Sequence, residues 1–243
     1  MRLRARALAS ASIALACSGC APTPLEKAAH LARALESGAR ARIEAEIADD
    51  YSDPLGDRQR LLADLEAFFQ ATERRSIALA DLEVLAAEPS LTSIVVIGKQ
   101  VIEVEGRPSW KLVGPLHLEL ARSDLRVRSG VLDDLRGIRA LFAARRAALE
   151  ANDAAGIGVL LHPQYRDGDR TREETVARLG SDLAGLPIRF EPLSYWAEVR
   201  GIEAHVDERY QMSVGTASAT PARVGRFTLR RSAGQWRIAG GLY

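Results

Sequence analysis

The chain carries two copies of one local pattern, 114 residues apart. The first copy reads ADDYSDPLGDR from residue 48, and the second reads LHPQYRDGDR from residue 161. Each copy places a tyrosine two residues before an aspartate, as Tyr51 with Asp53 and Tyr165 with Asp167. This spacing far exceeds that of solenoid repeats, so it predicts tandem duplication of a whole folding unit.

In the first half, helical periodicity runs from Leu25 to the turn at Pro54 and Gly56, and again from about Asp57 to Thr72. The apolar period then shortens toward two, which is typical of β-strands. Four strands are predicted, at residues 76–88, 92–106, 109–123 and 124–132.

The second half repeats this order. Helical periodicity covers residues 137–153 and continues as a helical turn into Pro163. Thr171 and Glu174 have the spacing of a capping box, which predicts the start of a third helix. Four further strands are predicted, at residues 188–201, 203–216, 222–232 and 235–243.

We therefore divide the chain into a leader and tether (1–24), a first half (25–134) and a second half (135–243). Each half has a size that can fold independently. The strand at 92–106 is apolar on both faces, which indicates cover on both sides. We expect the sheet of the other half to supply the second layer, so that the two halves pack as an intramolecular pseudo-dimer.

The leader MRLRARALASASIALACSGC has a basic start, an uncharged stretch and small residues before a cysteine. The apolar stretch is too short to span a bilayer, since a spanning helix needs roughly 20 residues. The leader is similar to a bacterial lipoprotein signal, in which the cysteine is lipidated with diacylglycerol and palmitate. We prefer Cys17 as that residue, with Cys20 as the alternative and a plain cleaved leader as a third. The following residue, Ser18 or Ala21, is not aspartate, which in that family implies the outer membrane.

Composition excludes several classes of function. The net charge of +1 falls to −2 when the three leader arginines are removed, so nucleic acid is not an expected partner. No cysteine lies in the body, and no metal site is expected from the four scattered histidines, His30, His117, His162 and His205. Phosphate-loop and dinucleotide-binding motifs are missing from the sequence, so no cofactor is expected.

Two stretches resemble the nuclear-transport-factor-2-like superfamily, which includes polyketide-cyclase and ketosteroid-isomerase-like proteins. They are LEANDAAGIGVLLHPQYRDGD at residues 149–169 and LRRSAGQWRIAGG at residues 229–241. The first half keeps a related stretch at 35–58, but has Leu125 where a tryptophan is expected. The resemblance implies an α+β cone in each half, with amino-terminal helices packed on a strongly curved, mostly antiparallel sheet. It implies little about function, because this scaffold hosts many activities.

Enzymes of that superfamily hold catalytic carboxylates or a tyrosine in the cavity of the cone. The candidates here are Tyr51, Asp53, Tyr165 and Asp167, with His162 nearby. An aspartate in a bend rich in glycine and proline more often caps a helix or forms an Asx-turn. Because both halves keep the pair, we favour a structural role for it, and Asp167 is the first place to look for chemistry.

The segment EAHVDERYQMSV at residues 203–214 has one wholly polar face. Antiparallel sheets often expose such a face to solvent, which is the simplest interpretation. The alternative is a ligand or partner site. Its candidate residues are Tyr195, Trp196, His205, Asp207, Arg209 and Gln211.

The sequence thus predicts a lipid-anchored envelope protein of the periplasm or cell surface, and it favours a non-catalytic role over an enzymatic one. The expected role is to bind a small apolar ligand or an envelope protein partner. One alternative is an isomerase, dehydratase or cyclase that uses Asp53 or Asp167 as general base. Another is an assembly subunit that uses the polar strand at 203–213 as its interface.

Overall fold

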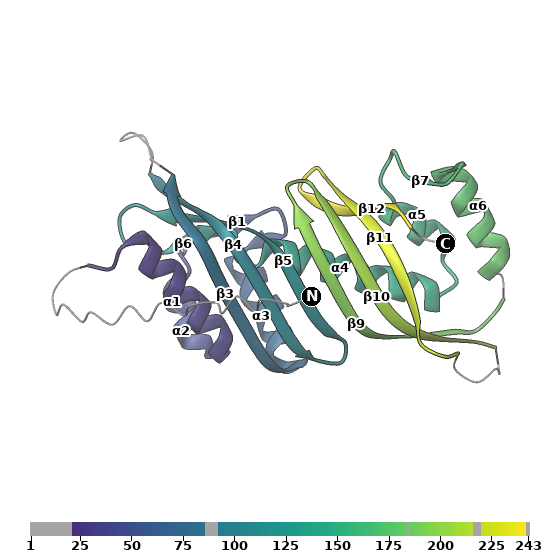
Figure 1. Ribbon diagram of the computed structural model, residues 1–243, viewed down its shortest axis with the longest axis horizontal. Helices are drawn as coiled ribbons and strands as arrows, with labels where there is room; N and C mark the ends of the chain where they lie inside the picture. Colours follow the sequence, from purple (N-terminus) through teal and green to yellow (C-terminus); the bar gives the residue numbers. More distant parts are fainter. Residues whose placement is uncertain (1–20, 86–91, 184, 216–219, 242–243) are drawn as a thin grey trace, which may run out of the picture.

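The structure is a computed structural model that describes residues 21–85, 92–183, 185–215 and 220–241. These residues form a mixed α+β fold with six helices and a large curved sheet of eight strands (Figure 1). The leader, with Cys17 and Cys20, lies outside the described residues. Within the described part of the chain, no helix combines the length and the apolar character needed to cross a membrane.

The first half begins with two helices where the sequence predicts one. Helix α1 spans Pro24–Ser37 and opens with a capping box between Thr23 and Glu26. Gly38 then adopts a left-handed conformation with φ of 65°, and a second helix α2 spans Arg40–Glu46. The prediction of one continuous helix is wrong here, because the left-handed glycine ends α1 and redirects the chain.

A short hairpin follows, made of β1 (Ser52–Asp53) and β2 (Gly56–Asp57), and leads into α3 (Arg58–Gln70). The predicted strands of the first half are all present. They are β3 (Thr72–Leu85), β4 (Ser93–Gly106), β5 (Ser109–Ala121) and β6 (Val127–Ser129).

The second half has the same order of elements. Helices α4 (Asp133–Glu150) and α5 (Ala154–Leu160) precede a hairpin of β7 (Arg166–Asp167) and β8 (Arg170–Thr171). The remaining elements are α6 (Arg172–Leu183), β9 (Ile188–Arg200), β10 (Glu203–Val214), β11 (Arg223–Ser232) and β12 (Gln235–Gly240). The predicted capping box is confirmed, because the side chains of Thr171 and Glu174 each accept from the backbone amide of the other.

The two sets of strands join edge to edge. The strand order is β12-β11-β10-β9-β5-β4-β3, and β6 pairs with β5. Along the main order all pairs are antiparallel except β5 with β9, which run parallel from Ser109 opposite Ser194 to Val113 opposite Glu198. We call this junction the seam. The expected second layer over residues 92–106 is therefore not the sheet of the other half, which extends the same sheet sideways.

One face of the sheet is covered by helices, and the opposite face is open. In β5 the side chains of Leu112, Leu116, Leu118 and Leu120 are buried, whereas Lys111 and His117 on the other face are exposed. Helix α1 packs on β3, and α4 runs behind the seam and contacts β9 (Figure 1). The close approach of the halves requires a glycine, because a Cβ atom on Gly114 of β5 would lie 2.9 Å from Cβ of Val199.

Candidate functional site

The Tyr51–Asp53 corner is a hydrogen-bonded turn. The buried Tyr51 hydroxyl donates to Oδ2 of Asp53 at 2.5 Å. Oδ1 of Asp53 accepts from the backbone amides of Leu55 at 2.7 Å and Gly56 at 2.9 Å, which is an Asx-type turn. The adjacent Asp57, rather than Asp53, caps helix α3.

An arginine from the second half closes this corner. Nη1 of Arg136 on α4 donates to Oδ2 of Asp53 at 2.6 Å, and Nη2 donates to Asp64 at 3.0 Å. Burial alone would raise the pKa of Asp53, but the Tyr51 hydroxyl and the Arg136 guanidinium outweigh it and hold the pKa below its ordinary value. A carboxylate that is so fully engaged is a weak general base.

Asp133, one turn before Arg136, has the opposite character. Burial and the nearby Asp53 carboxylate raise the pKa of Asp133 to about 7, although the Arg136 guanidinium opposes the change. Its Oδ1 atom is buried and forms no hydrogen bond with the residues that the structure describes. The start of α4 therefore holds a carboxyl group that changes protonation near neutral pH.

The second corner lies at the far end of the molecule. Tyr165 is buried, and Asp167 pairs with Arg170 across a two-residue hairpin in which Gly168 has φ of 60°. The neighbouring His162 is buried and accepts a hydrogen bond at Nδ1 from the amide of Gln164. Both Tyr-x-Asp pairs thus occupy the same hairpin position in their halves, and the two corners do not meet in one site.

The residues predicted as a site around β10 divide between the two faces of the sheet. His205 and Arg209 are exposed, and Asp207 and Gln211 are half-buried, as a solvated outer face requires. Trp196 lies on this face and is 40% exposed, but Tyr195 points into the core and is 4% exposed. Tyr195 therefore belongs to a different environment from the other five.

Tyr195 instead takes part in a buried ionic cluster that was not predicted from the sequence. Its hydroxyl donates to Glu208 at 2.7 Å, and Arg145 of α4 donates to the same carboxylate at 2.7 Å. Glu208 is fully buried, and the Arg145 guanidinium lies over the ring of Phe227 at 4.7 Å. The signal was present in the sequence, because Glu208 falls in the apolar phase of a strand whose other face is polar.

The interior of the first half is closed to ligands. Apolar side chains from α1 and the strands leave a cavity of only about 20 Å³. That volume holds at most a single water molecule. A ligand site must therefore lie elsewhere in this half.

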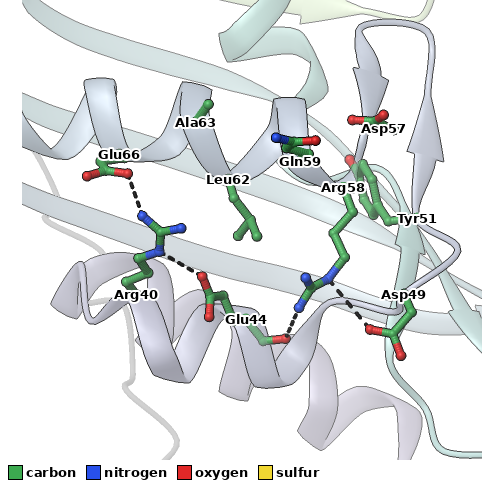
Figure 2. Close-up of a pocket in the computed structure, with 10 residues that line it drawn as sticks. All are labelled: Arg40, Glu44, Asp49, Tyr51, Asp57, Arg58, Gln59, Leu62, Ala63 and Glu66. Atoms are coloured by element: carbon green, nitrogen blue, oxygen red, sulfur yellow. Dashed lines mark hydrogen bonds and ion pairs between the residues drawn. The ribbon is translucent and has the colours of Figure 1, made fainter.

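One hollow is a groove of about 570 Å³ between α2 and α3, shown in Figure 2. The two arginines that line this groove, Arg40 and Arg58, already have partners within the chain. Arg40 reaches across the groove to Glu66 at 2.6 Å and also binds Glu44 at 2.7 Å (Figure 2). Arg58 donates to the backbone carbonyl of Glu44 and lies 3.9 Å from Asp49. A charged ligand would have to displace these pairs.

A more apolar recess of about 410 Å³ adjoins this groove. Leu62 lines both, and the recess continues past Leu65 and Phe69. Its remaining cation, Arg75, bonds the carbonyl of Glu36 and the hydroxyl of Thr72. This recess is therefore better suited to a neutral ligand than to a charged one.

A third hollow of about 370 Å³ lies at the seam, and we call it the seam pocket. It is bounded by α3, α4 and the paired strands β5 and β9. Four aromatic side chains contribute to its wall, namely Phe68, Trp110, Phe142 and Tyr195. Trp110 and Tyr195 are stacked with ring centroids 4.0 Å apart, which gives the pocket a flat apolar surface. Neither half forms this pocket alone.

Metal-binding clusters are not found in the part of the chain that the structure describes. No group of three or more histidine, cysteine, aspartate or glutamate side chains is placed there to hold an ion. Near the seam pocket, the carboxylates of Asp53 and Asp64 are engaged by Arg136 instead.

Among known proteins, no family model and no curated protein matches this chain. Solved structures to which it is similar include a protein of unknown function from Mycobacterium tuberculosis, with 19% identity and a TM-score of 0.40, over 44% of this chain and 68% of that one. A protein with a cystatin-like fold from Nostoc punctiforme matches with 14% identity and a TM-score of 0.40, over 45% and 88% of the two chains. A candidate dehydratase of the nuclear-transport-factor-2-like family from Streptomyces avermitilis matches with 17% identity and a TM-score of 0.38, over 44% and 91%.

Proposed function

We propose that this chain is a lipid-anchored envelope protein of two tandem cone domains of the nuclear-transport-factor-2-like type, and that it binds a small apolar ligand without catalysis. The leader sequence supports the anchor, with Cys17 preferred over Cys20. The repeated order of elements in residues 25–134 and 135–243 supports the tandem domains. We propose the outer membrane as its location, because the residue after the lipidated cysteine, Ser18 or Ala21, is not aspartate.

The seam pocket carries the ligand-binding proposal. Ligand sites are typically hollows of roughly 300–1,000 Å³ lined by aromatic and apolar groups with a few polar ones. The seam pocket has about 370 Å³ and four aromatic side chains in its wall. Sites between domains are also a preferred place for ligands.

The enzymatic alternative has weaker support. Asp53 accepts hydrogen bonds from Tyr51, Arg136 and two backbone amides, and its pKa is lowered. It also does not line the seam pocket. Asp167 lies in the β7–β8 hairpin, away from the seam. Neither aspartate is placed to remove a proton from a ligand in the seam pocket.

The test uses the neutral fluorescent probe 1-naphthalenemethanol with the full-length chain. We expect its fluorescence anisotropy to rise on binding, and Ala143→Phe to abolish this by filling the seam pocket. Ala147→Phe, on an exposed position of the same helix, is the matched control. Loss of binding in Leu62→Asp, with Ala143→Phe unaffected, would instead locate the ligand in the recess between α2 and α3.

One observation favours assembly as a second candidate function. A single row of side chains crosses five neighbouring strands on the open face of the sheet, through the pairs recorded at each step. The row runs, in strand order, Glu103, Lys111, Trp196, Asp207 and Arg226. Its charges are negative, positive, neutral, negative and positive. If a second copy of this row is turned end to end about Trp196 and laid over the first, every negative residue faces a positive one.

Such a row fits a second copy of the chain related by a two-fold axis that passes through the row at Trp196. Lys111 would then face the partner's Asp207, and Trp196 would face its own equivalent at the centre of an isologous contact. In the next row Glu198 would approach its own copy, but Arg200 already binds it at 2.6 Å and reduces the repulsion. Two sheets that pack face to face cross at an angle of about 30°, so their side chains move out of alignment away from the crossing point. Only the residues of this central row therefore need to lie directly opposite those of the partner.

A charge swap tests this assembly. We expect Lys111→Glu and Asp207→Lys each to shift the sedimentation of a dimer toward the monomer, and the double variant to restore the dimer. The internal pairs of Lys111 with Glu103 and of Asp207 with Arg226 are not restored in the double variant, so recovery reports the contact between copies. A wild-type chain that sediments as a monomer at about 100 µM, a concentration that detects even weak contacts, would exclude the proposal.

A further inference from the structure

The seam pocket has an unequal distribution of charge. Four arginines line it, Arg60, Arg136, Arg139 and Arg146, against one aspartate, Asp64. The sum of these charges is positive. A pocket with aromatic walls and an excess of cations is suited to an apolar ligand that carries a negative charge.

Three of the four arginines have carboxylate partners within the chain. Arg60 lies 3.0 Å from Asp64, and Arg136 binds Asp53 and Asp64. Arg146 lies 3.2 Å from Glu150, one turn further along α4. These guanidinium groups are neutralised before any ligand arrives.

Arg139 is different. It forms no ion pair among the described residues, and its guanidinium carbon lies 4.4 Å from the centroid of the Phe68 ring. Burial lowers the pKa of Arg139, and the more distant Asp64 offsets this only in part. An arginine in a protein keeps its proton, so the half-buried Arg139 places on the pocket wall a positive charge that Asp64 offsets only in part.

The surroundings of Arg139 define the ligand that would satisfy it. A guanidinium offers two parallel N–H groups, which match the two oxygens of one carboxylate. Flat rings stack on aromatic walls such as the paired Trp110 and Tyr195. One free guanidinium fits a single negative charge better than the two charges of a phosphate monoester.

We infer that the ligand of the seam pocket is a small aromatic monocarboxylate whose carboxylate binds Arg139 while its ring lies between the aromatic walls. This inference rests on the proposed ligand-binding function and specifies the chemical class of the ligand. It goes beyond the expectation of a merely apolar ligand, because a guanidinium without an ion pair on the pocket wall favours an anionic group on the ligand.

The experiment compares 1-naphthoate with its neutral counterpart 1-naphthalenemethanol on the full-length chain, by titration with each probe. We expect naphthoate to bind about tenfold more tightly, the usual size of a charge-assisted pair. Arg139→Met should weaken naphthoate by about tenfold and leave the alcohol within about twofold. Arg139→Lys should retain part of the preference. The control Arg42→Met, at an exposed position of α2 away from the seam pocket, should change neither probe.

The outcomes separate this inference from the proposed function. Binding of the alcohol without any preference for naphthoate would overturn the carboxylate inference and leave the ligand pocket standing. The same holds if Arg139→Met weakens both probes equally. If neither probe binds the wild-type chain, the proposed function itself fails. Salt at about 1 M should weaken naphthoate alone, because only its binding depends on charge.

Discussion

The ring of Trp110 stacks on the ring of Tyr195 with centroids 4.0 Å apart and an angle of 16° between the planes. Trp110 comes from β5 and Tyr195 from β9, so this contact joins the two halves of the chain. The hydroxyl of the same tyrosine binds Glu208 in the core of the second half. One side chain thus links the seam, the pocket wall and a buried ion pair.

The buried pair between Arg145 and Glu208 gives the first prediction. Arg145→Met should destabilise the chain by about 3–5 kcal/mol, because it leaves a fully buried carboxylate without its cation. Urea unfolding followed by circular dichroism measures this loss. Adding Glu208→Gln should recover most of the stability, since the unpaired charge is then removed. A loss below about 1 kcal/mol in the single variant would show that the pair is not desolvated as described.

Asp133 gives a prediction about pH. Its folded-state pKa is raised from 3.8 to about 7, so the folded chain holds this proton more tightly than the unfolded chain. Stability from this group is therefore present at low pH and lost as pH rises from about 4 to about 7. Asp133→Asn removes the effect, so its stability relative to wild type should increase by roughly 2–3 kcal/mol between about pH 4.5 and pH 8.

The neighbouring charges that act on Asp133 are Asp53, Asp134 and Arg136, and they are unchanged in this variant. Comparing the variant with the wild type at each pH therefore reports the loss of the Asp133 carboxyl group together with its effect on the neighbouring Asp53. Chemical denaturation at several pH values is sufficient. A difference that stays flat across that range would contradict the raised pKa.

The approach of β5 to β9 gives a third prediction. Gly114→Ala should destabilise the chain by about 1–3 kcal/mol, because the added methyl group would lie 2.9 Å from Val199 across the seam. Gly180→Ala is the control. Gly180 lies in the exposed part of α6, where the nearest atom would be 3.8 Å away, so alanine should stabilise by up to about 1 kcal/mol. Thermal unfolding should move in opposite directions for the two variants.

The anchor can be tested by metabolic labelling with palmitate. We expect the label to be lost in Cys17→Ala and kept in Cys20→Ala. Loss in Cys20→Ala alone would assign the lipid to the second cysteine. Labelling that is missing from the wild-type chain would reduce the leader to a plain cleaved signal.

Much of the secondary structure could be predicted from the sequence, because the apolar period reports the local conformation. The four strands of the second half were predicted on this basis. The capping box at Thr171 was predicted from the spacing of Thr171 and Glu174. The break at Gly38 was missed, because apolar periodicity continues through Ile43 and hides the left-handed residue. For Asp53 the sequence left open a helix cap or an Asx-turn, because aspartate beside proline and glycine favours both. The structure shows the turn, and Asp57 is the helix cap.

The candidate site could not be predicted in the same way. The seam pocket depends on the pairing of residues 109–113 with residues 194–198, a contact that no local pattern encodes. Arg146 is paired within α4 itself, by Glu150. Arg139 has no ion pair among the described residues, and it differs from Arg136 and Arg145 of α4 only through the positions of carboxylates from other elements. Such a difference becomes visible only after the whole chain is folded.

The parallel pairing of β5 with β9 has a consequence for how this chain can be divided. A fragment that ends before α4 would leave the backbone amides and carbonyls of residues 109–113 without their partners, and one that begins at α4 would do the same to residues 194–198. Exposed strand edges of this kind recruit other strands. Each half would then be prone to pair with a half from another molecule, and the covalent link between them keeps that exchange within one chain.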